Sequence, residues 1–432
     1  MKVAILGFSD IAQSESLPTY RYFKKQGADI TAYYWNNPAV PDDIEKIQID
    51  EGADIEGLDE FDVIVRGPAV HPRQIKTDKP VTSLTNIFVD NCPTKNLIGV
   101  TGTKGKGTTS TLITKMLEAA GKKVWLGGNI GKPLLDNLDN IGSDDWVVLE
   151  MSSQQLIGFR GHVPIGVCLT IVPEHLNFFT DMAEYIAAKS CLFAAQTSDD
   201  IAIYYSDSEL SYRIADAGAG TKTPYYTSPG AWVNGNLITI DGQEICTTDE
   251  LKLLGKHNWQ NICAAATAVW QAGVHDTAAI RAVATSFAGL PHRLEKVRVL
   301  DDVTYYNDSF ASAPDAAIAA LQAIEAPKVM IVGGFDRMLP IDHLAKAFVG
   351  ANLRKVLLIG ASAQRLAEAC KRAGFDNFII LSEKTMPEIV ARARAEAQTD
   401  DAIVLSPGFA SFDMFKNFED RGDQFREVVL GL

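Results

Sequence analysis

Residues Thr101–Thr109, TGTKGKGTT, are the stretch of this chain whose composition points most directly to chemistry. They follow the apolar run Asn96–Val100 and precede a segment of helical character, Ser110–Ala120. A glycine-rich turn between a buried strand and a helix N-terminus directs backbone N–H groups at an anion, and its lysine meets the terminal phosphates of a nucleotide. The sequence therefore predicts a site for nucleotide phosphates made by Gly102, Thr103, Lys104, Gly105, Lys106, Gly107 and Thr108.

This loop departs from the strict pattern G-x-x-x-x-G-K-[ST], which would place a glycine at Val100 and a hydroxyl at Gly107. Thr108, one position later, is a candidate to direct its hydroxyl at a metal ion. The alternative interpretation is an ordinary glycine-rich turn with a solvated lysine. The strand–loop–helix context favours the phosphate site over that alternative.

Further candidates follow two later apolar runs. Glu150 ends the run VVLE, and a carboxylate at the end of a strand beside a phosphate loop is well placed to hold Mg²⁺. Glu174 and His175 follow the next run, in PEHLNFF, where a divalent cation or a substrate could bind. Lys189 lies in the helical run AEYIAAKSCLF, and the residues alone predict a solvated helix lysine there.

Positioning these residues requires sheets whose strands end at a common edge, and the alternation of strands and helices predicts an α/β fold of three domains. We expect a Rossmann-like domain in residues 1–92, a P-loop ATPase-like domain in residues 93–290 and a second Rossmann-like domain in residues 291–432. The first turn, GFSDIA from Gly7, lacks two glycines of a dinucleotide fingerprint, which disfavours a tight NAD site but not a nucleotide-sugar diphosphate.

The expected elements follow the same division. Residues Thr221–Thr248, rich in Gly, Thr and Tyr, predict small β-hairpins in the central domain, and a helix is expected at Asn258–Ala272. The other expected strands are Lys2–Gly7, Ala28–Trp35, Asp62–Arg66, Leu97–Val100, Val124–Leu126, Trp146–Leu149, Val167–Ile171, Lys328–Val332, Val356–Ile359, Phe378–Leu381 and Ala402–Leu405.

Composition limits the class of protein. The 432 residues carry a formal net charge of −14, and without a basic stripe this argues against a nucleic-acid partner. The six cysteines are scattered without a C-x-x-C pair, as expected in a reducing compartment. Because we find no signal segment and no apolar run of membrane-spanning length, we expect a cytoplasmic protein that is not bound to a membrane. We also expect a monomer.

Eight motifs occur in an order and spacing similar to those of the Mur ligases, the ATP-dependent amide ligases of peptidoglycan precursor synthesis. The resemblance covers essentially the whole chain, and the closing run Leu405–Phe425 most resembles the members that add glutamate to UDP-N-acetylmuramoyl-L-alanine. The motifs are TGTKGKGTT, GGNIG (Gly127–Gly131), LEMSSQQL (Leu149–Leu156), PEHLNFF, YIAAK, GKHNWQN (Gly255–Asn261), GLPHRLE (Gly289–Glu295) and NDSFASAP (Asn307–Pro314).

The resemblance implies a carboxylate-activating enzyme that forms an acyl phosphate from ATP and then an amide. Lys106, His175 and Lys189 match the family's catalytic residues, and Lys189 matches a lysine that is carbamylated in relatives. Two Mg²⁺ ions are implied, held among Glu150, His175, Lys189 and Thr108. The matched ligand contacts are Asn258, Asn261, Arg293 and Asp308 for ATP; Asn129, Ser152 and Gln155 for the UDP-linked substrate; and Ser312, Arg337, Ser411 and Phe418 for the amino acid.

The chain also departs from the family pattern near the amino-acid site. Glutamate-adding members commonly read D-S-K-A-T-N where this chain has Phe310 in place of the lysine and Ser312 in place of the threonine. Arg337 stands where many relatives have a lysine, and the two are not equivalent at a carboxylate site. We expect D-glutamate as the substrate. The alternatives are L-glutamate, a folylpolyglutamate-type ligase and a nucleotide-binding regulator without ligase chemistry.

Overall fold

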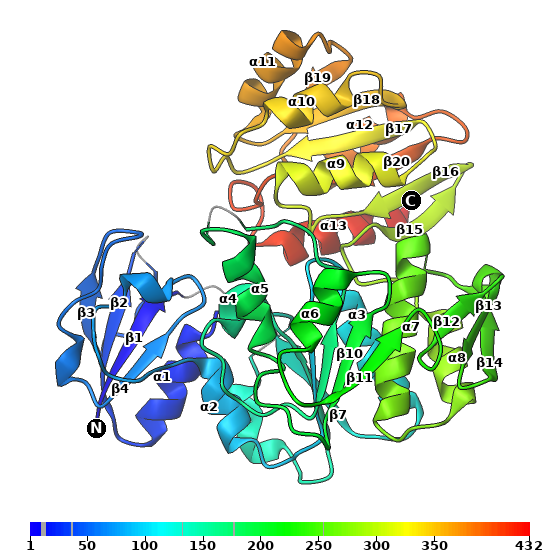
Figure 1. Ribbon diagram of the computed structural model, residues 1–432. Helices are drawn as coiled ribbons and strands as arrows, with labels where there is room; N and C mark the ends of the chain where they lie inside the picture. Colours follow the sequence, from blue (N-terminus) through cyan, green and yellow to red (C-terminus); the bar gives the residue numbers. More distant parts are fainter. Residues whose placement is uncertain (10–13, 36–37, 132, 176–177, 254) are drawn as a thin grey trace. The chain divides into compact units, whose positions relative to one another are not determined.

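The computed structural model describes residues 1–9, 14–35, 38–131, 133–175, 178–253 and 255–432. The chain divides into two units, Met1–Phe287 and Ala288–Leu432 (Figure 1). The expected turn at Gly7 and the PEHLNFF motif fall partly outside the described residues, at 10–12 and at Leu176 and Asn177. No helix of the described part is long and apolar enough to cross a membrane.

The first unit begins with a parallel sheet in the order β3-β2-β1-β4-β5. Its strands are short and rich in Val and Ile, as expected for strands buried on both faces of a parallel sheet. Helix α1 follows β1, and α2 carries the chain to the next sheet. The elements are β1 (Lys2–Phe8), α1 (Ser16–Lys25), β2 (Asp29–Tyr34), β3 (Glu45–Gln48), η1 (Leu58–Glu60), β4 (Val63–Arg66), η2 (Pro72–Gln74), β5 (Val81–Thr82) and α2 (Leu84–Asn91).

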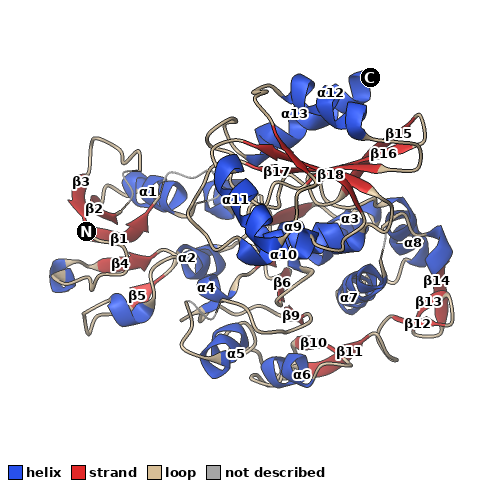
Figure 2. Ribbon diagram, turned by 90° about the horizontal axis from the view of Figure 1, so that it is seen from above, coloured by secondary structure: helices blue, strands red, loops and turns tan. Residues whose placement is uncertain are grey.

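The second sheet of this unit is also parallel, in the order β11-β10-β9-β6-β8-β7. Helices α3 and α7 contact it together with α6, and Figure 2 shows α3 and α7 on the other side of the strands from α5 and α6. The elements are β6 (Leu97–Thr101), α3 (Lys106–Ala119), β7 (Val124–Gly128), η3 (Leu134–Asn140), β8 (Trp146–Glu150), α4 (Ser153–Leu156), β9 (Ile165–Cys168), α5 (Met182–Ser190), β10 (Ile201–Tyr205), α6 (Glu209–Ala215), β11 (Thr221–Tyr225), α7 (Lys256–Gln271) and α8 (Thr277–Ser286).

The segment expected to form hairpins divides in two. Strands β12, β13 and β14 form an antiparallel meander, which confirms hairpins there. Strand β11 instead pairs parallel with β10, so the first part of the segment is the edge of the main sheet and the hairpin prediction is wrong for it. The meander comprises β12 (Trp232–Asn234), β13 (Leu237–Ile240) and β14 (Gln243–Thr247), followed by η4 (Thr248–Glu250).

The second unit has one sheet, in the order β15-β16-β20-β17-β18-β19, parallel except for the pair β15–β16. Apolar side chains of α9, α10 and α11 pack in one core and those of α12 and α13 in another, on the two faces seen in Figure 2. The elements are β15 (Glu295–Leu300), β16 (Val303–Asn307), α9 (Pro314–Ala323), β17 (Lys328–Gly333), α10 (Asp342–Phe348), β18 (Leu353–Ile359), α11 (Ala363–Ala373), β19 (Phe378–Ile380), α12 (Met386–Glu396), β20 (Ala402–Leu405) and α13 (Phe418–Gly431).

The α/β class expected from the sequence is confirmed by these parallel sheets. The sequence analysis did not predict the antiparallel pair β15–β16, which lies at one edge of the sheet. Predicted domain limits at residues 92 and 290 remain predictions.

Candidate functional site

The phosphate loop leaves the middle of the second sheet, because β6 lies between β8 and β9. Val100 is paired with Glu150 of β8, and Thr101 with Cys168 of β9. The loop and the polar residue that ends β8 therefore meet at the carboxyl edge of a parallel sheet, which is where open α/β sheets bind their ligands.

Helix α3 begins at Lys106, directly after Gly105. Gly105 has φ of +85°, and a Cβ there would lie 2.2 Å from Oδ1 of Asn261. The same oxygen accepts a hydrogen bond from the Thr109 hydroxyl at 3.3 Å, and Asn261 donates to Oδ1 of Asn258 at 2.8 Å. The two asparagines of α7 thus lie against the loop, and glycine is required for that close approach.

The two lysines of the loop make different contacts. Nζ of Lys106 donates to the carbonyl oxygens of Gly102 and Thr103, both at 3.0 Å, so its ammonium lies over the loop backbone. Lys104 is largely exposed and pairs with Glu174 at 3.3 Å. Gly107 and Thr108 belong to the first turn of α3, where backbone N–H groups are available to an anion.

Glu150 is buried at the end of β8 and uses only one of its carboxylate oxygens within the protein. Oε1 accepts a hydrogen bond from Nδ2 of Asn129 at 2.9 Å, whereas Oε2 has no hydrogen-bond partner among the described residues. A buried carboxylate oxygen without a partner is costly unless a ligand satisfies it. The donor set fits Mg²⁺, which binds one or two carboxylates and takes its other ligands from phosphates and water.

Lys189 is buried, with 1% of its surface exposed, although the residues alone predicted a solvated lysine. That prediction is wrong because α5 turns this position inward: Nζ donates to the Gly102 carbonyl at 2.9 Å and lies 4.7 Å from the Tyr185 ring centroid. Burial, with the nearby Lys106 ammonium, lowers the pKa of Lys189 to about 7. A substantial fraction of this amine is therefore neutral near pH 7.

His175 lies beyond β9 with φ of +58°, an uncommon backbone conformation for a residue other than glycine. Burial lowers its pKa, against the opposing effect of Glu174, whose Oε2 is 3.7 Å from Nε2. No three His, Cys, Asp or Glu side chains of the described ranges converge as a complete metal cage. A cation at this edge would therefore depend on phosphate and water ligands.

Of the residues predicted to bind the UDP-linked substrate, Ser152 and Gln155 are joined to each other. The Ser152 hydroxyl accepts from the Gln155 N–H at 3.2 Å, and Gln155 Oε1 accepts from the Ser152 N–H at 3.0 Å. This capping box begins α4 directly after the Glu150 strand. Gln155 Nε2 also donates to Oε1 of Glu15 at 2.7 Å, so these side chains have structural partners.

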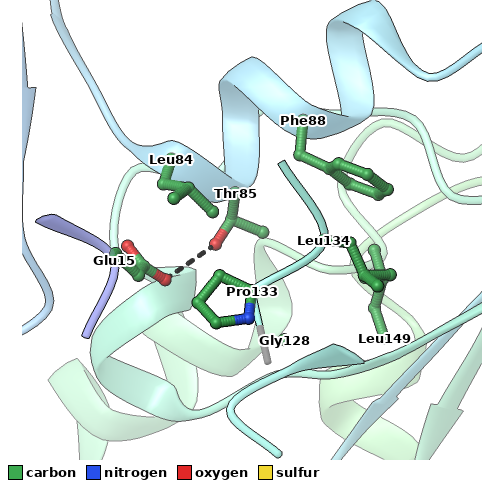
Figure 3. A pocket seen from close by; sticks show the side chains of 8 residues that line it. All are labelled: Glu15, Leu84, Thr85, Phe88, Gly128, Pro133, Leu134 and Leu149. Atoms are coloured by element: carbon green, nitrogen blue, oxygen red, sulfur yellow. Dashed lines mark hydrogen bonds between the residues drawn. The ribbon is translucent and has the colours of Figure 1, made fainter. Parts of the chain in front are cut away.

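Glu15 was not predicted as part of the site, since nothing in the run QSES distinguishes it. Burial raises its pKa, and the Thr85 hydroxyl donates to it at 3.4 Å. The carboxyl lines a small pocket shown in Figure 3, otherwise bounded mainly by apolar side chains. The pocket residues are Glu15, Leu84, Thr85, Phe88, Gly128, Pro133, Leu134 and Leu149.

The remaining predicted residues belong to the second unit. Asp308 is buried after β16, where Oδ1 accepts from the Leu294 N–H at 3.0 Å and Oδ2 from the Ser406 hydroxyl at 2.7 Å. Burial raises the pKa of Asp308 to about 7. The guanidinium carbon of Arg293 lies 3.8 Å from the centroid of the Phe310 ring, which is 5.2 Å from that of Phe418.

Ser312, Ser411 and Arg337 complete the predicted amino-acid set. The Ser312 hydroxyl donates to the Phe310 carbonyl at 3.2 Å, Ser411 is buried, and Arg337 is exposed. Sequence reasoning missed the buried Arg421, which donates to both the hydroxyl and the carbonyl of Ser309, at 2.9 and 2.8 Å. It also donates to the carbonyls of residues 409 and 410, so it joins the two loops that carry the predicted amino-acid contacts.

Comparison with known proteins gives an independent assignment. Residues 100–269 match the model of the Mur ligase middle domain, and residues 292–409 match that of the Mur ligase glutamate ligase domain. A UDP-N-acetylmuramoylalanine--D-glutamate ligase of Clostridium novyi is 33% identical, covering 100% of this chain and 97% of that protein. The protein of the same name in Clostridium kluyveri is 34% identical over 95% of this chain and 93% of its own length.

Solved structures support the same fold. A UDP-N-acetylmuramate-alanine ligase from Thermotoga maritima has a TM-score of 0.59 at 17% identity, over 100% of this chain and 99% of that one. MurF from Acinetobacter baumannii has a TM-score of 0.60 at 14% identity, over 98% and 93%. From its full-length relatives and its matched domains, we conclude that this chain belongs to the Mur ligase family.

Proposed function

We propose that the protein is an ATP-dependent ligase that joins D-glutamate to UDP-N-acetylmuramoyl-L-alanine. In the proposed reaction the alanyl carboxylate attacks the γ-phosphorus of ATP, giving an acyl phosphate and ADP. The amino group of glutamate then attacks the acyl carbon, phosphate leaves, and an amide is formed. The names of the full-length relatives support this substrate pair.

The observation that carries the proposal is the grouping at the carboxyl edge of the second sheet. One sheet edge carries the phosphate loop with Lys106, the Glu150 carboxylate with its unpartnered oxygen, and the buried Lys189 amine, whose pKa is lowered. Transfer of a phosphoryl group to a carboxylate brings two anions together, so the reaction needs the positive charge of Lys106 and of a cation held by the acid.

Each residue of this edge has a proposed part. The N–H groups of the loop and the first turn of α3 bind the ATP phosphates, and Lys106 offsets charge on the transferred phosphoryl group. Asn258 and Asn261, which lie against the loop, are proposed nucleotide contacts from α7. Asn129 holds the Glu150 carboxylate through Oε1, which leaves Oε2 available to a cation.

The residues present fit Mg²⁺, with Glu150 and His175 as proposed protein ligands and the Thr108 hydroxyl as a further candidate. Bound there, Mg²⁺ would supply charge neutralisation to the phosphates. Lys189 fits the proposed carbamylation, because a neutral amine attacks the carbon of CO₂ and releases one proton as the carbamate forms. Its pKa of about 7 provides that neutral amine, and the carbamate nitrogen keeps one N–H to donate to the Gly102 carbonyl.

The second unit supplies the remaining proposed contacts. Arg293 and Asp308 are proposed for the nucleotide, and Ser312, Arg337, Ser411 and Phe418 for glutamate. Ser152 and Gln155, with Asn129, are proposed for the UDP-linked substrate. The capping box between Ser152 and Gln155 supports a positioning role as well, because it begins α4 at the sheet edge.

The decisive experiment measures phosphate release with ATP, Mg²⁺ and UDP-N-acetylmuramoyl-L-alanine, with D- or L-glutamate as the second substrate. We expect release that requires both the UDP-linked substrate and D-glutamate, and a product of the mass of the amide. Faster turnover with L-glutamate would assign the other enantiomer, in line with Phe310 and Arg337. No release with either enantiomer would refute the proposed reaction.

A further inference from the structure

Phe310 lies between two residues that are proposed to touch different substrates. The guanidinium of Arg293, a proposed nucleotide contact, lies over the face of its ring at 3.8 Å from the centroid. The Phe418 ring, at the proposed glutamate site, forms a T-shaped pair with it, with centroids 5.2 Å apart and planes at 90°. One side chain thus contacts both proposed sites.

The backbone around Phe310 is held at several points, so the position of the ring is set by the fold. The Phe310 N–H donates to the His292 carbonyl at 3.0 Å, which joins it to the segment that carries Arg293. The hydroxyl of the preceding Ser309 donates to the Phe418 carbonyl at 2.8 Å. These contacts hold the segments that carry Arg293 and Phe418 next to the turn of Phe310. Phe310 itself is 41% exposed.

An aromatic ring suits this position in a way that the lysine common in related glutamate-adding members does not. The face of a phenyl ring carries partial negative charge and attracts a guanidinium, whereas its edge is partially positive and packs against the face of a second ring. A lysine here would place a second positive charge beside Arg293. Phenylalanine instead lets the Arg293 guanidinium lie over a ring at this position.

We propose that Phe310 is a positioning residue that couples the nucleotide and amino-acid sites, because its ring holds Arg293 through a cation–π contact and Phe418 through a T-shaped contact. The inference rests on the proposed function, because that function assigns Arg293 to ATP and Phe418 to glutamate. Because the ring contacts both residues, its loss should weaken the binding of both ligands.

The test compares Phe310→Leu with Phe310→Tyr. Leucine keeps an apolar side chain but removes the ring, and we expect the KM for ATP and the KM for glutamate each to rise about three- to tenfold, as for the loss of an exposed cation–π contact. Tyrosine keeps both the face and the edge, so both KM values should stay within about twofold of the wild type. Phe378→Leu is the matched control, because Phe378 lies on β19 at the opposite edge of the sheet.

Calorimetric titration with a non-hydrolysable ATP analogue measures nucleotide binding without turnover. We expect a similar rise in its Kd for Phe310→Leu and no change for Phe310→Tyr or Phe378→Leu. Unchanged KM values and an unchanged Kd in Phe310→Leu would overturn the inference, as would equal losses in Phe310→Leu and Phe378→Leu. If the wild type itself shows no phosphate release, the proposed function fails, while the titration still tests Phe310.

Discussion

Two buried carboxylates, Asp145 directly before β8 and Glu150 at its last residue, have different hydrogen-bond environments. At the start of the strand, Oδ2 of Asp145 accepts from Lys123 Nζ at 2.8 Å, from Trp125 Nε1 at 2.8 Å and from the Gly142 N–H at 2.9 Å. At the end, Glu150 has one hydrogen bond from Asn129, and its Oε2 has no partner in the described part of the chain. The two residues are similarly buried, at 8% and 4% exposed.

The difference separates a structural carboxylate from one that is prepared for a ligand. Lys123, with the other two donors, holds the pKa of Asp145 at about 2, so its charge stabilises the folded protein. The unpartnered oxygen of Glu150 destabilises the folded protein, and a bound cation or hydrogen-bond donor would remove that penalty. The carboxylate that precedes this strand is therefore satisfied by the protein, whereas the one at its carboxyl end keeps an oxygen that we propose binds a cation.

The largest effect should follow from Glu150→Gln, which removes the charge but keeps an oxygen for Asn129. We expect kcat to fall about 10²- to 10³-fold, since loss of one electrostatic contact in an active site has effects of that size. The Mg²⁺ concentration for half-maximal activity should also rise. Activity against Mg²⁺ concentration, together with a thermal melt, is the measurement.

Asp145→Asn is the matched control at the other end of the same strand. Its kcat should stay within about twofold of the wild type, because removing a charge away from the active site leaves transition-state binding intact. The comparison fails if both variants lose activity equally, or if Glu150→Gln keeps the activity of the wild type.

Lys189→Ala should have the next largest effect. The change removes the proposed carbamate, and we expect about a 10²-fold loss of kcat. Short carboxylates such as formate or acetate should restore part of the activity by taking the place of the anion. Steady-state rates with increasing carboxylate test this, and a fully active alanine variant would refute any catalytic role for Lys189.

Arg421→Met examines a buried charge that, like Asp145, is satisfied within the protein. Arg421 donates to Ser309 and to the carbonyls of residues 409 and 410, which would lose their donor. We expect the free energy of unfolding to fall by about 3 kcal/mol, measured by urea denaturation. Arg426→Met on the same helix removes a half-exposed ion pair with Asp423 and should cost less than about 1 kcal/mol.

The smallest effect is the pH dependence of Asp145. Its folded pKa of about 2 lies below the ordinary value of 3.8, so the stability it contributes is present above pH 4 and is lost as the pH falls towards 2. The stability difference between the wild type and Asp145→Asn should be constant from pH 7 to 5 and shrink below pH 4. Asp144→Asn, an exposed neighbour, should show no such difference. Urea midpoints of the wild type and both variants, measured from pH 7 to 2, test this prediction.

Much of the fold could be predicted from the sequence because strand and helix periodicity are local properties. The runs that became β1, β6, β8 and β20 are apolar except at an end residue in the first three, as expected for central strands of parallel sheets. Pairing is not local. The segment that became β11 has the composition of a hairpin, and only its contact with β10 made it a parallel edge strand.

Site residues divide in the same way. Glycines and a lysine in TGTKGKGTT predict a phosphate loop, because their spacing fixes how one short backbone segment can bind an anion. The sequence around Lys189 carries no such signal. Its amine contacts Gly102, which is distant in the chain, and Tyr185, which lies on the same helix. Glu15 and Arg421 were missed for the same reason.

By itself, the sequence determined the α/β class, the phosphate loop and, through its motifs, the resemblance to the Mur ligases. Only the tertiary structure decided which charged groups have partners. Asp145 accepts hydrogen bonds from three donors, whereas Oε2 of Glu150 has no partner among the described residues. Burial of the Lys189 amine lowers its pKa to about 7. The physical reason is that residue type sets which bonds a group can make. Its burial and its partners, which the fold brings from distant segments, set which of those bonds remain for a substrate.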